Sequence, residues 1–369
     1  MLQTVVGTRL TRWACGGLLL VGSLGCGPVV GSEDTGGAAE GGGTEPQATT
    51  GTESSASDSS TSGGLAPCIE ALEFGAAGAI SPQVVGDQLF WATNDGRVQV
   101  RPVPEGVPED VLVTGTSVVT FNVVGAGLLY ASEGEVRILS FMGDPAIPVA
   151  AEQNNPLSPV QLGDRVYWLN AGSGILAGRL MLRDLDGPRE EVADGLGFPR
   201  SLVTDGSDVF ALVSDYINDA GELSGVVLRY DDAEGGLEVL ATTSSPQSLR
   251  FHAGRLYWLE QQGPGLSGPL SVRSIDTDGG TALTHATLEA FGISLAVDDA
   301  DAYFTTLDAG VSRVYRVGLV TGDTEVVLED DNAPIFGVAL APDAAYITSI
   351  RAAEEAQPSD VVLTRICRE

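Results

Sequence analysis

The chain has 369 residues, and 19 basic residues against 50 acidic ones give it a net charge of −31 at pH 7. Every basic residue is Arg, which excludes chemistry that needs a lysine ammonium: P-loop nucleotide hydrolysis, pyridoxal Schiff bases, protein-kinase transfer and Ser–Lys dyads. The acidic balance argues against DNA or RNA as a partner, because phosphates need a basic face. Two histidines, His252 and His285, leave little for a multi-histidine zinc site.

Residues 1–25 have the pattern of an export signal. Arg9 and Arg12 precede an apolar run that is short for a membrane span, which takes about 20 residues. The run ends in Ser-Leu-Gly before Cys26, and this ending resembles the bacterial lipoprotein box, although Ser23 stands where that family usually carries Leu. The resemblance implies that Cys26 carries palmitate-type acyl chains as the first mature residue. The alternative is an ordinary cleaved signal in which Cys26 is incidental.

The segment 26–66 is predicted to be a flexible tether. From residue 31 to residue 64 it is almost wholly Gly, Ser, Thr, Ala, Glu and Asp, with no aromatic residue. Such a composition cannot bury enough apolar surface to offset the entropy of ordering. We therefore expect an exported protein anchored by lipid in the outer membrane, facing the periplasm or the cell surface.

A short phrase recurs through residues 67–369: a turn with Gly or Asp, then an apolar and usually aromatic pair, then more apolar residues or Thr. It is anchored on Phe90, Leu129, Tyr167, Phe210, Tyr257, Tyr303 and Tyr346. The spacings are 39, 38, 43, 47, 46 and 43 residues. Seven copies at this period fit units of four short strands, so we predict an all-β, seven-bladed β-propeller. Copies two and four carry the phrase imperfectly, which leaves six or eight blades as alternatives.

The two ends of this region are predicted to close the ring. The last copy supplies three strands, and residues 70–73 resemble residues 326–329, a fourth strand of an earlier copy. The N-terminal segment therefore completes the last blade as its outer strand. With Cys15 removed and Cys26 acylated, Cys68 and Cys367 remain, and an exported compartment permits their pairing in a disulfide.

The phrases FWATNDGRVQVRPV (90–103) and YWLN…GRLMLRDLDG (167–187) resemble the repeat of YWTD-type propellers. They resemble more closely an uncharacterised family of bacterial propeller lipoproteins, whose repeats read VYWTN…G.V.RVPLDGG. The likeness covers residues 68 to 367 and implies four-stranded blades with the phrase on the second strand. The Asp of true YWTD repeats is replaced by Asn94, Asn170 and Glu260. No receptor-type ligand binding is therefore carried over.

Several motifs that suggest chemistry are better explained as structure. The string Gly263–Gly268 matches GxGxxG but contains Pro264 and is followed by no helix, so we expect a hairpin loop. Asp184–Gly187 and Asp276–Gly279 begin like a calcium loop but lack its remaining ligands, which favours β-turns.

The histidines and the paired aromatics are also expected to be structural. His252 ends a first strand, and His285 is placed in the polar stretch after a fourth strand. No Ser or Cys nucleophile is tied to either by a motif. The repeat-equivalent pairs Tyr167-Trp168 and Tyr257-Trp258 could form a sugar platform, but packing between blades is the favoured interpretation.

A ligand site, if present, is expected at one mouth of the central channel. The candidates lie in the segments that lead into the innermost strands: Gln83, Asn155, Arg200, Gln247, Arg250, Phe291 and Phe336. The longer excursions 214–224, 260–269 and 350–360 join second to third strands, and we place them on the opposite rim.

These observations predict a non-catalytic binding or scaffolding module of the cell envelope. We expect a monomer with no cofactor, no metal and no nucleic-acid partner, which binds an envelope protein or polysaccharide. The alternative is a lactonase- or lyase-like enzyme with a metal in the channel, which needs three or four Asp, Glu, Asn or His side chains converging there. Innermost strands such as 201–203 and 293–295 are poor in carboxylates. A surface architecture protein without a discrete ligand is a third interpretation.

Overall fold

The structure is a computed structural model that describes residues 69–74, 79–93, 95–174, 176–217, 223–262, 268–308, 310–351 and 360–368. The chain divides into two units, Met1–Ala66 and Pro67–Glu369, and the described residues belong to the second. The predicted signal 1–25, Cys26, the tether 26–66 and Cys68 lie outside the described residues. In the described part, no helix is long and apolar enough to span a membrane.

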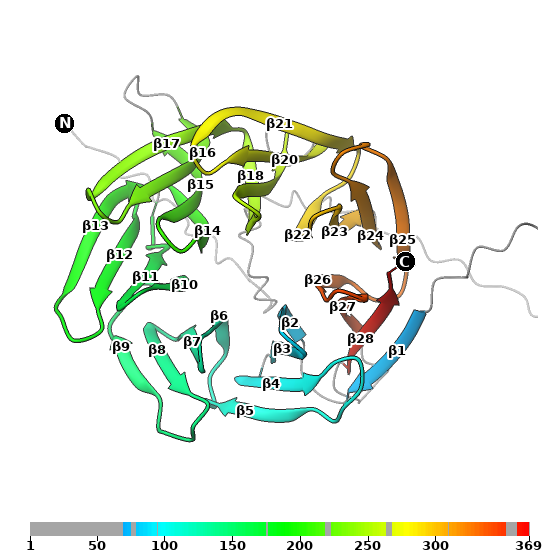
Figure 1. The fold of residues 1–369 in the computed structure, drawn as a ribbon, viewed down its shortest axis with the longest axis horizontal. Helices are drawn as coiled ribbons and strands as arrows, with labels where there is room; N and C mark the ends of the chain where they lie inside the picture. The colour runs from blue at the N-terminus through cyan, green and yellow to red at the C-terminus, as the bar shows by residue number, and fades with distance from the viewer. Residues whose placement is uncertain are drawn as a thin grey trace, which may run out of the picture. The chain divides into compact units, whose positions relative to one another are not determined.

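Twenty-eight strands in this part of the chain form seven four-stranded sheets arranged radially around a central axis (Figure 1). Blades 1 and 2 comprise β2 (Ala79–Val85), β3 (Gln88–Thr93), β4 (Arg97–Pro102), β5 (Glu109–Val113), β6 (Val118–Val124), β7 (Gly127–Ser132), β8 (Glu135–Ser140) and β9 (Ile147–Ala150). Blades 3 and 4 comprise β10 (Pro156–Leu162), β11 (Arg165–Asn170), β12 (Gly178–Asp184), β13 (Arg189–Leu196), β14 (Phe198–Thr204), β15 (Val209–Ile217), β16 (Leu223–Asp231) and β17 (Gly236–Thr243).

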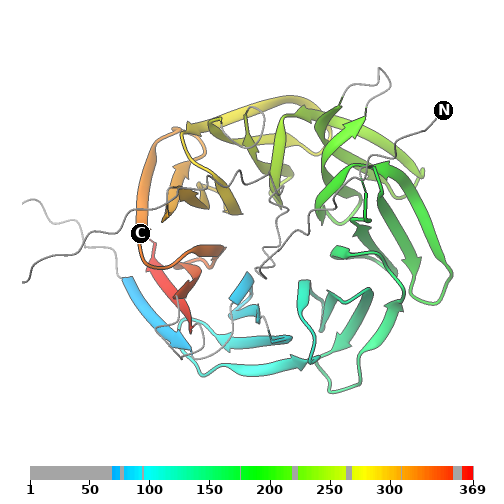
Figure 2. The same cartoon turned by 180° about the vertical axis from the view of Figure 1, so that it is seen from behind.

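Blades 5 and 6 comprise β18 (Ser245–His252), β19 (Arg255–Gln261), β20 (Leu270–Asp276), β21 (Gly279–Leu288), β22 (Gly292–Val297), β23 (Asp301–Asp308), β24 (Val311–Gly318) and β25 (Thr324–Asp330). Blade 7 comprises β26 (Ile335–Leu340), β27 (Ala344–Arg351), β28 (Asp360–Cys367) and β1 (Ile69–Phe74). The predicted all-β class and the count of seven blades are both confirmed, and the view from behind shows the same ring (Figure 2).

The recurring phrase forms the second strand of every blade. Its seven anchor residues lie on β3, β7, β11, β15, β19, β23 and β27, and each is at most 5% exposed. β-Branched and aromatic side chains suit a strand that is covered on both faces by neighbouring blades. The period in the sequence therefore reflects one buried strand per blade.

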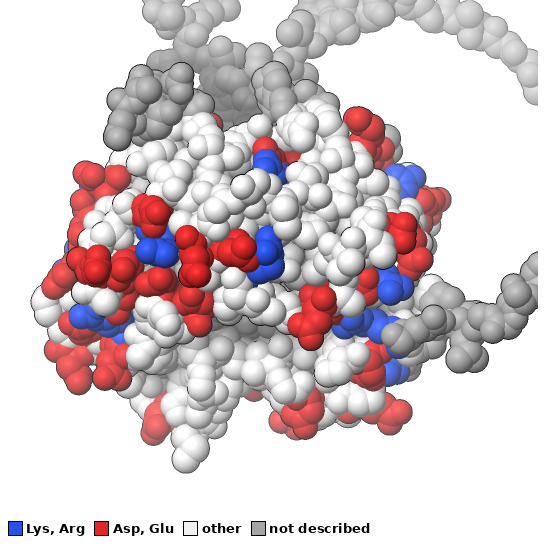
Figure 3. Space-filling view, turned by 45° about the horizontal axis from the view of Figure 1, so that its top comes forward, with Lys and Arg blue, Asp and Glu red and all other residues white. Residues whose placement is uncertain are grey.

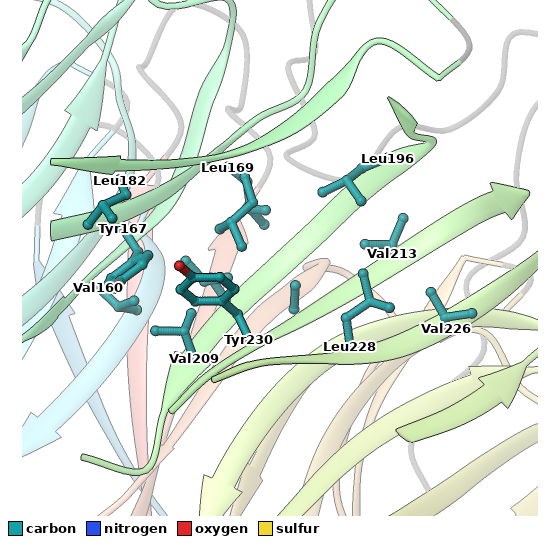
Figure 4. Packing of buried hydrophobic residues seen from close by; sticks show 13 residues of the cluster. Val160, Tyr167, Leu169, Leu182, Leu196, Val209, Val213, Val226, Leu228 and Tyr230 are labelled. Atoms are coloured by element: carbon teal, nitrogen blue, oxygen red, sulfur yellow. The ribbon is translucent and has the colours of Figure 1, made fainter. Parts of the chain in front are cut away.

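The core is divided into seven apolar clusters, one between each pair of adjacent blades. Tyr167 packs with Val209 and Tyr230 of blade 4 (Figure 4). Its neighbour Trp168 points the other way and packs with Leu129 of blade 2. Alternation along one strand thus joins three blades, and the predicted inter-blade packing of these aromatics is confirmed.

The first described strand closes the ring. β1 pairs antiparallel with β28, with Ile69 opposite Ile366 and Phe74 opposite Val361, so the predicted outer strand of the last blade is confirmed. The closing interface has an apolar cluster of its own, in which Trp91 of blade 1 packs with Tyr346 of blade 7.

The antiparallel order within each blade defines two faces of the ring. In blade 5, Ser245, Gln261, Leu270 and Leu288 are successive partners across the four strands. The segments that join fourth to first strands and second to third strands therefore emerge on one face, named here the loop face. The hairpins between first and second and between third and fourth strands lie on the other, the turn face. The placement of the excursions on the opposite rim is wrong, because two successive reversals return the chain to the side from which it started.

Ion pairs recur where the second and third strands meet near the turn face. Examples are Arg165 with Asp184 at 3.0 Å and Arg365 with Asp343 at 2.9 Å. Figure 3 shows acidic and basic side chains interspersed over the surface in view, with acidic ones in excess. Exposed pairs of this kind contribute about 0–1 kcal/mol each, so the apolar clusters dominate the stability of the ring.

Candidate functional site

The central channel contains a cavity of about 910 Å³. Its wall is formed by the C-terminal halves of the seven innermost strands, and it reaches the hairpin residues Gly125, Ala126 and Gly163 of the turn face. Ligand sites in propellers and other folds are concave, mostly apolar cavities of about 300–1,000 Å³. The channel is therefore the candidate site.

Each innermost strand carries one β-bulge against its second strand. In three blades the bulge contains a serine with positive φ: Ser81 at 54°, Ser158 at 46° and Ser248 at 52°. An extra residue bends the strand and exposes backbone groups that the ladder no longer uses. The bulges were not predicted, although Pro82 and Pro159, which cannot donate to a ladder, are a signal for them.

Polar side chains near these bulges join neighbouring blades. Gln83 Nε2 donates to the Phe121 carbonyl at 2.6 Å, and Gln83 Oε1 accepts from Val123 N at 3.4 Å. Ser248 Oγ accepts from Leu295 N at 3.0 Å, which links blade 5 to blade 6. Gln83 lines the channel as expected, but its amide serves the joint between blades 1 and 2.

Arg250 also lines the channel, on β18 just beyond the bulge. Its Nη1 donates to the Leu249 carbonyl at 2.9 Å. Burial lowers the pKa of Arg250, because a guanidinium in a confined space loses hydration of its charged form. A cation placed in this cavity is the strongest chemical feature of the wall.

The other five predicted candidates do not line this cavity; they are Asn155, Arg200, Gln247, Phe291 and Phe336. They lie in or just before the first halves of the innermost strands, toward the loop face. Arg200 Nε donates to Ser214 Oγ at 3.2 Å, and burial lowers the pKa of Arg200 while nearby Asp215 opposes that shift. The structure therefore brings only Gln83 and Arg250 of the seven to one cavity.

The histidines join blades 5 and 6. His252 Nε2 lies 2.7 Å from Asp299 Oδ1. His285 lies within β21, not after it, because this fourth strand is ten residues long. Its Nδ1 is 2.8 Å from the Leu319 carbonyl and its Nε2 is 2.8 Å from Ser274 Oγ. Ser274 is 0% exposed, so this serine–histidine contact cannot reach a substrate.

The two four-residue motifs that begin like calcium loops, Asp184–Gly187 and Asp276–Gly279, form the predicted hairpins between third and fourth strands. Gly187 N donates to the Asp184 carbonyl at 2.9 Å, and Asp276 pairs with Gly279. The carboxylates of Asp184 and Asp276 accept from arginines of their own blades. Among the described residues, no group of three or more His, Cys, Asp or Glu side chains could hold a metal ion. The glycine-rich string Gly263–Gly268 falls almost wholly outside the described residues, between β19 and β20.

Asn170 and Glu260, which the sequence predicted to match the Asp of YWTD repeats, hold segments of the loop face in place. Asn170 Nδ2 and Trp168 Nε1 both donate to Gln153 Oε1 at 3.0 Å. Glu260 is 4% exposed, lies 2.7 Å from Arg273 and accepts from Ser244 N at 3.1 Å. Both side chains anchor the segment that leads into an innermost strand, which is a structural role. Asn94 lies outside the described residues.

Solved structures share this architecture. The β-propeller domain of Myceliophteria thermophila Cps50 (Swd1) aligns with a TM-score of 0.60 and 11% identity over 80% of this chain and 99% of that one. The WD40 domain of Neurospora crassa Pan2 aligns at 0.54 and 10% identity over 79% and 90%. The computationally designed Ika8 protein aligns at 0.52 and 11% over 77% and 96%. The fold is a β-propeller. No protein-family model and no curated protein matches the sequence, so the likeness extends to the fold alone.

Proposed function

We propose that this protein is a lipid-anchored, exported propeller that acts as a non-catalytic binding or scaffolding module of the cell envelope. The ring provides a rigid frame, and the tether 26–66 sets its distance from the membrane. The 17 Arg and 44 Asp and Glu of residues 67–369 give the domain a charge near −27, which repels other acidic surfaces.

The wall of the channel carries the non-catalytic part of this proposal. The described residues that line it include no Asp, Glu or His. A metal-dependent lactonase- or lyase-like enzyme needs several such ligands at one point. The half-buried amide of Gln83, which lines the wall, is occupied by the joint between blades 1 and 2.

The anchoring part is tested by labelling with a palmitate analogue in a bacterial host that processes lipoproteins. The intact chain should be labelled and found in the outer-membrane fraction, whereas Cys26→Ser should be unlabelled and released. Label retained by Cys26→Ser would contradict the proposal.

The binding part is tested by cross-linking in the native envelope followed by identification of the captured species. The same envelope protein or polysaccharide should be captured in repeated experiments, and far less of it with the released Cys26→Ser chain. Stoichiometric divalent metal in the purified protein, lost together with a hydrolytic activity on chelation, would instead support the enzyme alternative.

A further inference from the structure

The wall of the channel is almost free of charge. It is built from Val, Leu, Ala, Phe, Pro, Gly and neutral polar residues, and Arg250 is the one ionisable side chain among the described residues that line it. The chain as a whole carries −31. The charge of the channel wall, a single cation among neutral residues, therefore differs from the strongly acidic charge of the chain as a whole.

The positive charge of Arg250 is balanced by few protein groups. A guanidinium has five N–H donors, and the described contact is one bond from Nη1 to the Leu249 carbonyl, its neighbour on β18. Burial lowers the pKa of Arg250 with no opposing contribution from an acidic neighbour. By contrast, Asp and Glu partners raise the pKa of Arg97 and Arg313 on the outer surface.

A half-buried cation without a counter-ion costs free energy, and an anion in the cavity offsets that cost. The planar fork of a guanidinium matches a carboxylate or phosphoryl group in two parallel hydrogen bonds. Ser201, a hydroxyl-bearing residue on the adjacent strand β14, lines the same cavity. The apolar side chains Val203, Phe251 and Ala296 line it as well and suit a hydrocarbon body.

We propose that the channel binds a small organic molecule through an oxyanion, a carboxylate or phosphoryl group, held by the Arg250 guanidinium. This inference deepens the proposed binding function by naming the ligand class. The two proposals are tested by separate experiments. If the purified protein binds no small anion, this proposal fails, while capture of an envelope partner by cross-linking still supports the proposed binding function.

The charge of the turn face disfavours an anion that carries many negative groups. In the hairpins that follow the innermost strands, Asp298 and Asp343 are paired with Arg368 and Arg365, whereas blades 1, 3 and 4 carry the further carboxylates Asp87, Asp164 and Asp205. They repel a polyanion that approaches this mouth, whereas a small molecule with one anionic group passes with less repulsion.

The test is calorimetric titration of the full mature chain with sodium phosphate and, separately, sodium benzoate at constant ionic strength. We expect saturable one-to-one binding of at least one probe below ~10 mM. Tighter binding of benzoate identifies a carboxylate with an apolar body, and tighter binding of phosphate identifies a phosphoryl group. Absence of saturable binding of both probes would overturn the proposal.

Three variants locate the site. Arg250→Gln should weaken binding about tenfold or more, and Arg250→Lys, which keeps the charge but loses the fork, should weaken it less. Arg179→Gln removes an exposed arginine paired with Glu191 on blade 3 and should bind as the parent does. Equal binding by Arg250→Gln and the parent would overturn the proposal, and so would Arg250-dependent binding of heparin, a polyanion.

A thermal readout separates binding from a structural role. Without a probe anion, Arg250→Gln should melt no lower than the parent, because it removes an uncompensated charge. With saturating anion the parent should melt higher, so that the order reverses. A variant that melts lower by the same amount under both conditions would identify Arg250 as purely structural. If Arg250→Gln does not fold, the Arg250→Lys titration decides the question by the same criterion.

Discussion

A Cβ atom on Gly337 would lie 2.3 Å from Cδ of Pro82. Gly337 borders the bulge of β26 and Pro82 is in the bulge of β2, so this contact joins blade 7 to blade 1. The ring of Pro82 is fixed to the backbone and cannot swing aside. The two innermost strands therefore approach at the closing interface as closely as a glycine permits.

Gly337→Ala is accordingly expected to lower the free energy of unfolding by about 1–3 kcal/mol, the range for overpacking. Urea unfolding followed by tryptophan fluorescence measures the change. Gly236→Ala, at a position with nothing within 4 Å of the added Cβ, is the control and should be close to neutral. Equal effects of the two substitutions would contradict close contact between blades 7 and 1.

Gln83→Ala should destabilise the ring by about 1–2 kcal/mol, because it leaves the Phe121 carbonyl and Val123 N without their side-chain partner. Gln161→Ala is the matched control. Gln161 also lines the channel, but it donates to Gly163 in its own hairpin. The free energy of unfolding should be well below the parent's in Gln83→Ala and close to it in Gln161→Ala. The reverse order would favour a ligand-binding role for Gln83.

Glu260→Gln should cost about 3 kcal/mol, since it removes the buried carboxylate of an ion pair and leaves the half-buried Arg273 without its charged partner. Glu329→Gln breaks the exposed pair with Arg313, with the same 2.7 Å separation, and should cost about 0–1 kcal/mol. Chemical unfolding of both variants measures the difference. A cost for Glu260→Gln as small as that for Glu329→Gln would show that the Glu260 pair is solvated.

Stability is expected to fall at alkaline pH. Burial raises the pKa of Tyr130, Tyr257, Tyr303 and Tyr346, all on second strands. A pKa raised in the folded state means that ionisation favours unfolding, so this stability is fully present below the unfolded tyrosine pKa of about 10 and is lost as the pH rises above it.

The measurement is urea unfolding between pH 8 and pH 11, with tyrosinate absorption recorded in parallel. Tyr303→Phe should flatten part of the alkaline decline, because it removes one of the four titrating groups. An identical pH profile for parent and variant would show that Tyr303 does not contribute.

The sequence predicted the features that repeat and missed those that depend on neighbouring blades. Tyr167 and Trp168 could be assigned to inter-blade packing because an aromatic pair at a fixed period must be buried on both sides of its strand. The pairing of residues 70–73 with the last blade followed from a missing fourth strand. Both features follow from the positions of the repeats along the sequence.

The role of Gln83 could not be predicted in the same way. Its partner Phe121 belongs to the next blade, and the register between innermost strands is set by bulges that leave a faint signal. The contact between His285 and Ser274 depends on the full length of β21, which its polar composition hides. Arg250 was among the candidates, but the neutrality of the wall around it required the assembled ring.

The propeller is one circular array that is closed by the two ends of residues 67–369. Ile69 is opposite Ile366 in the antiparallel pair β1–β28, and Cys367 is the next residue of β28. The sequence predicts that Cys367 pairs with Cys68 in a disulfide. A disulfide between them would close a loop of about 300 residues and add at most about 5–6 kcal/mol by the chain-entropy relation.

Peptide mass spectrometry of the unreduced, alkylated protein tests this closure. We expect a single cross-linked species that joins the peptides of Cys68 and Cys367 and separates on reduction. Recovery of both cysteines as alkylated free thiols, from protein isolated in its oxidising compartment, would contradict it.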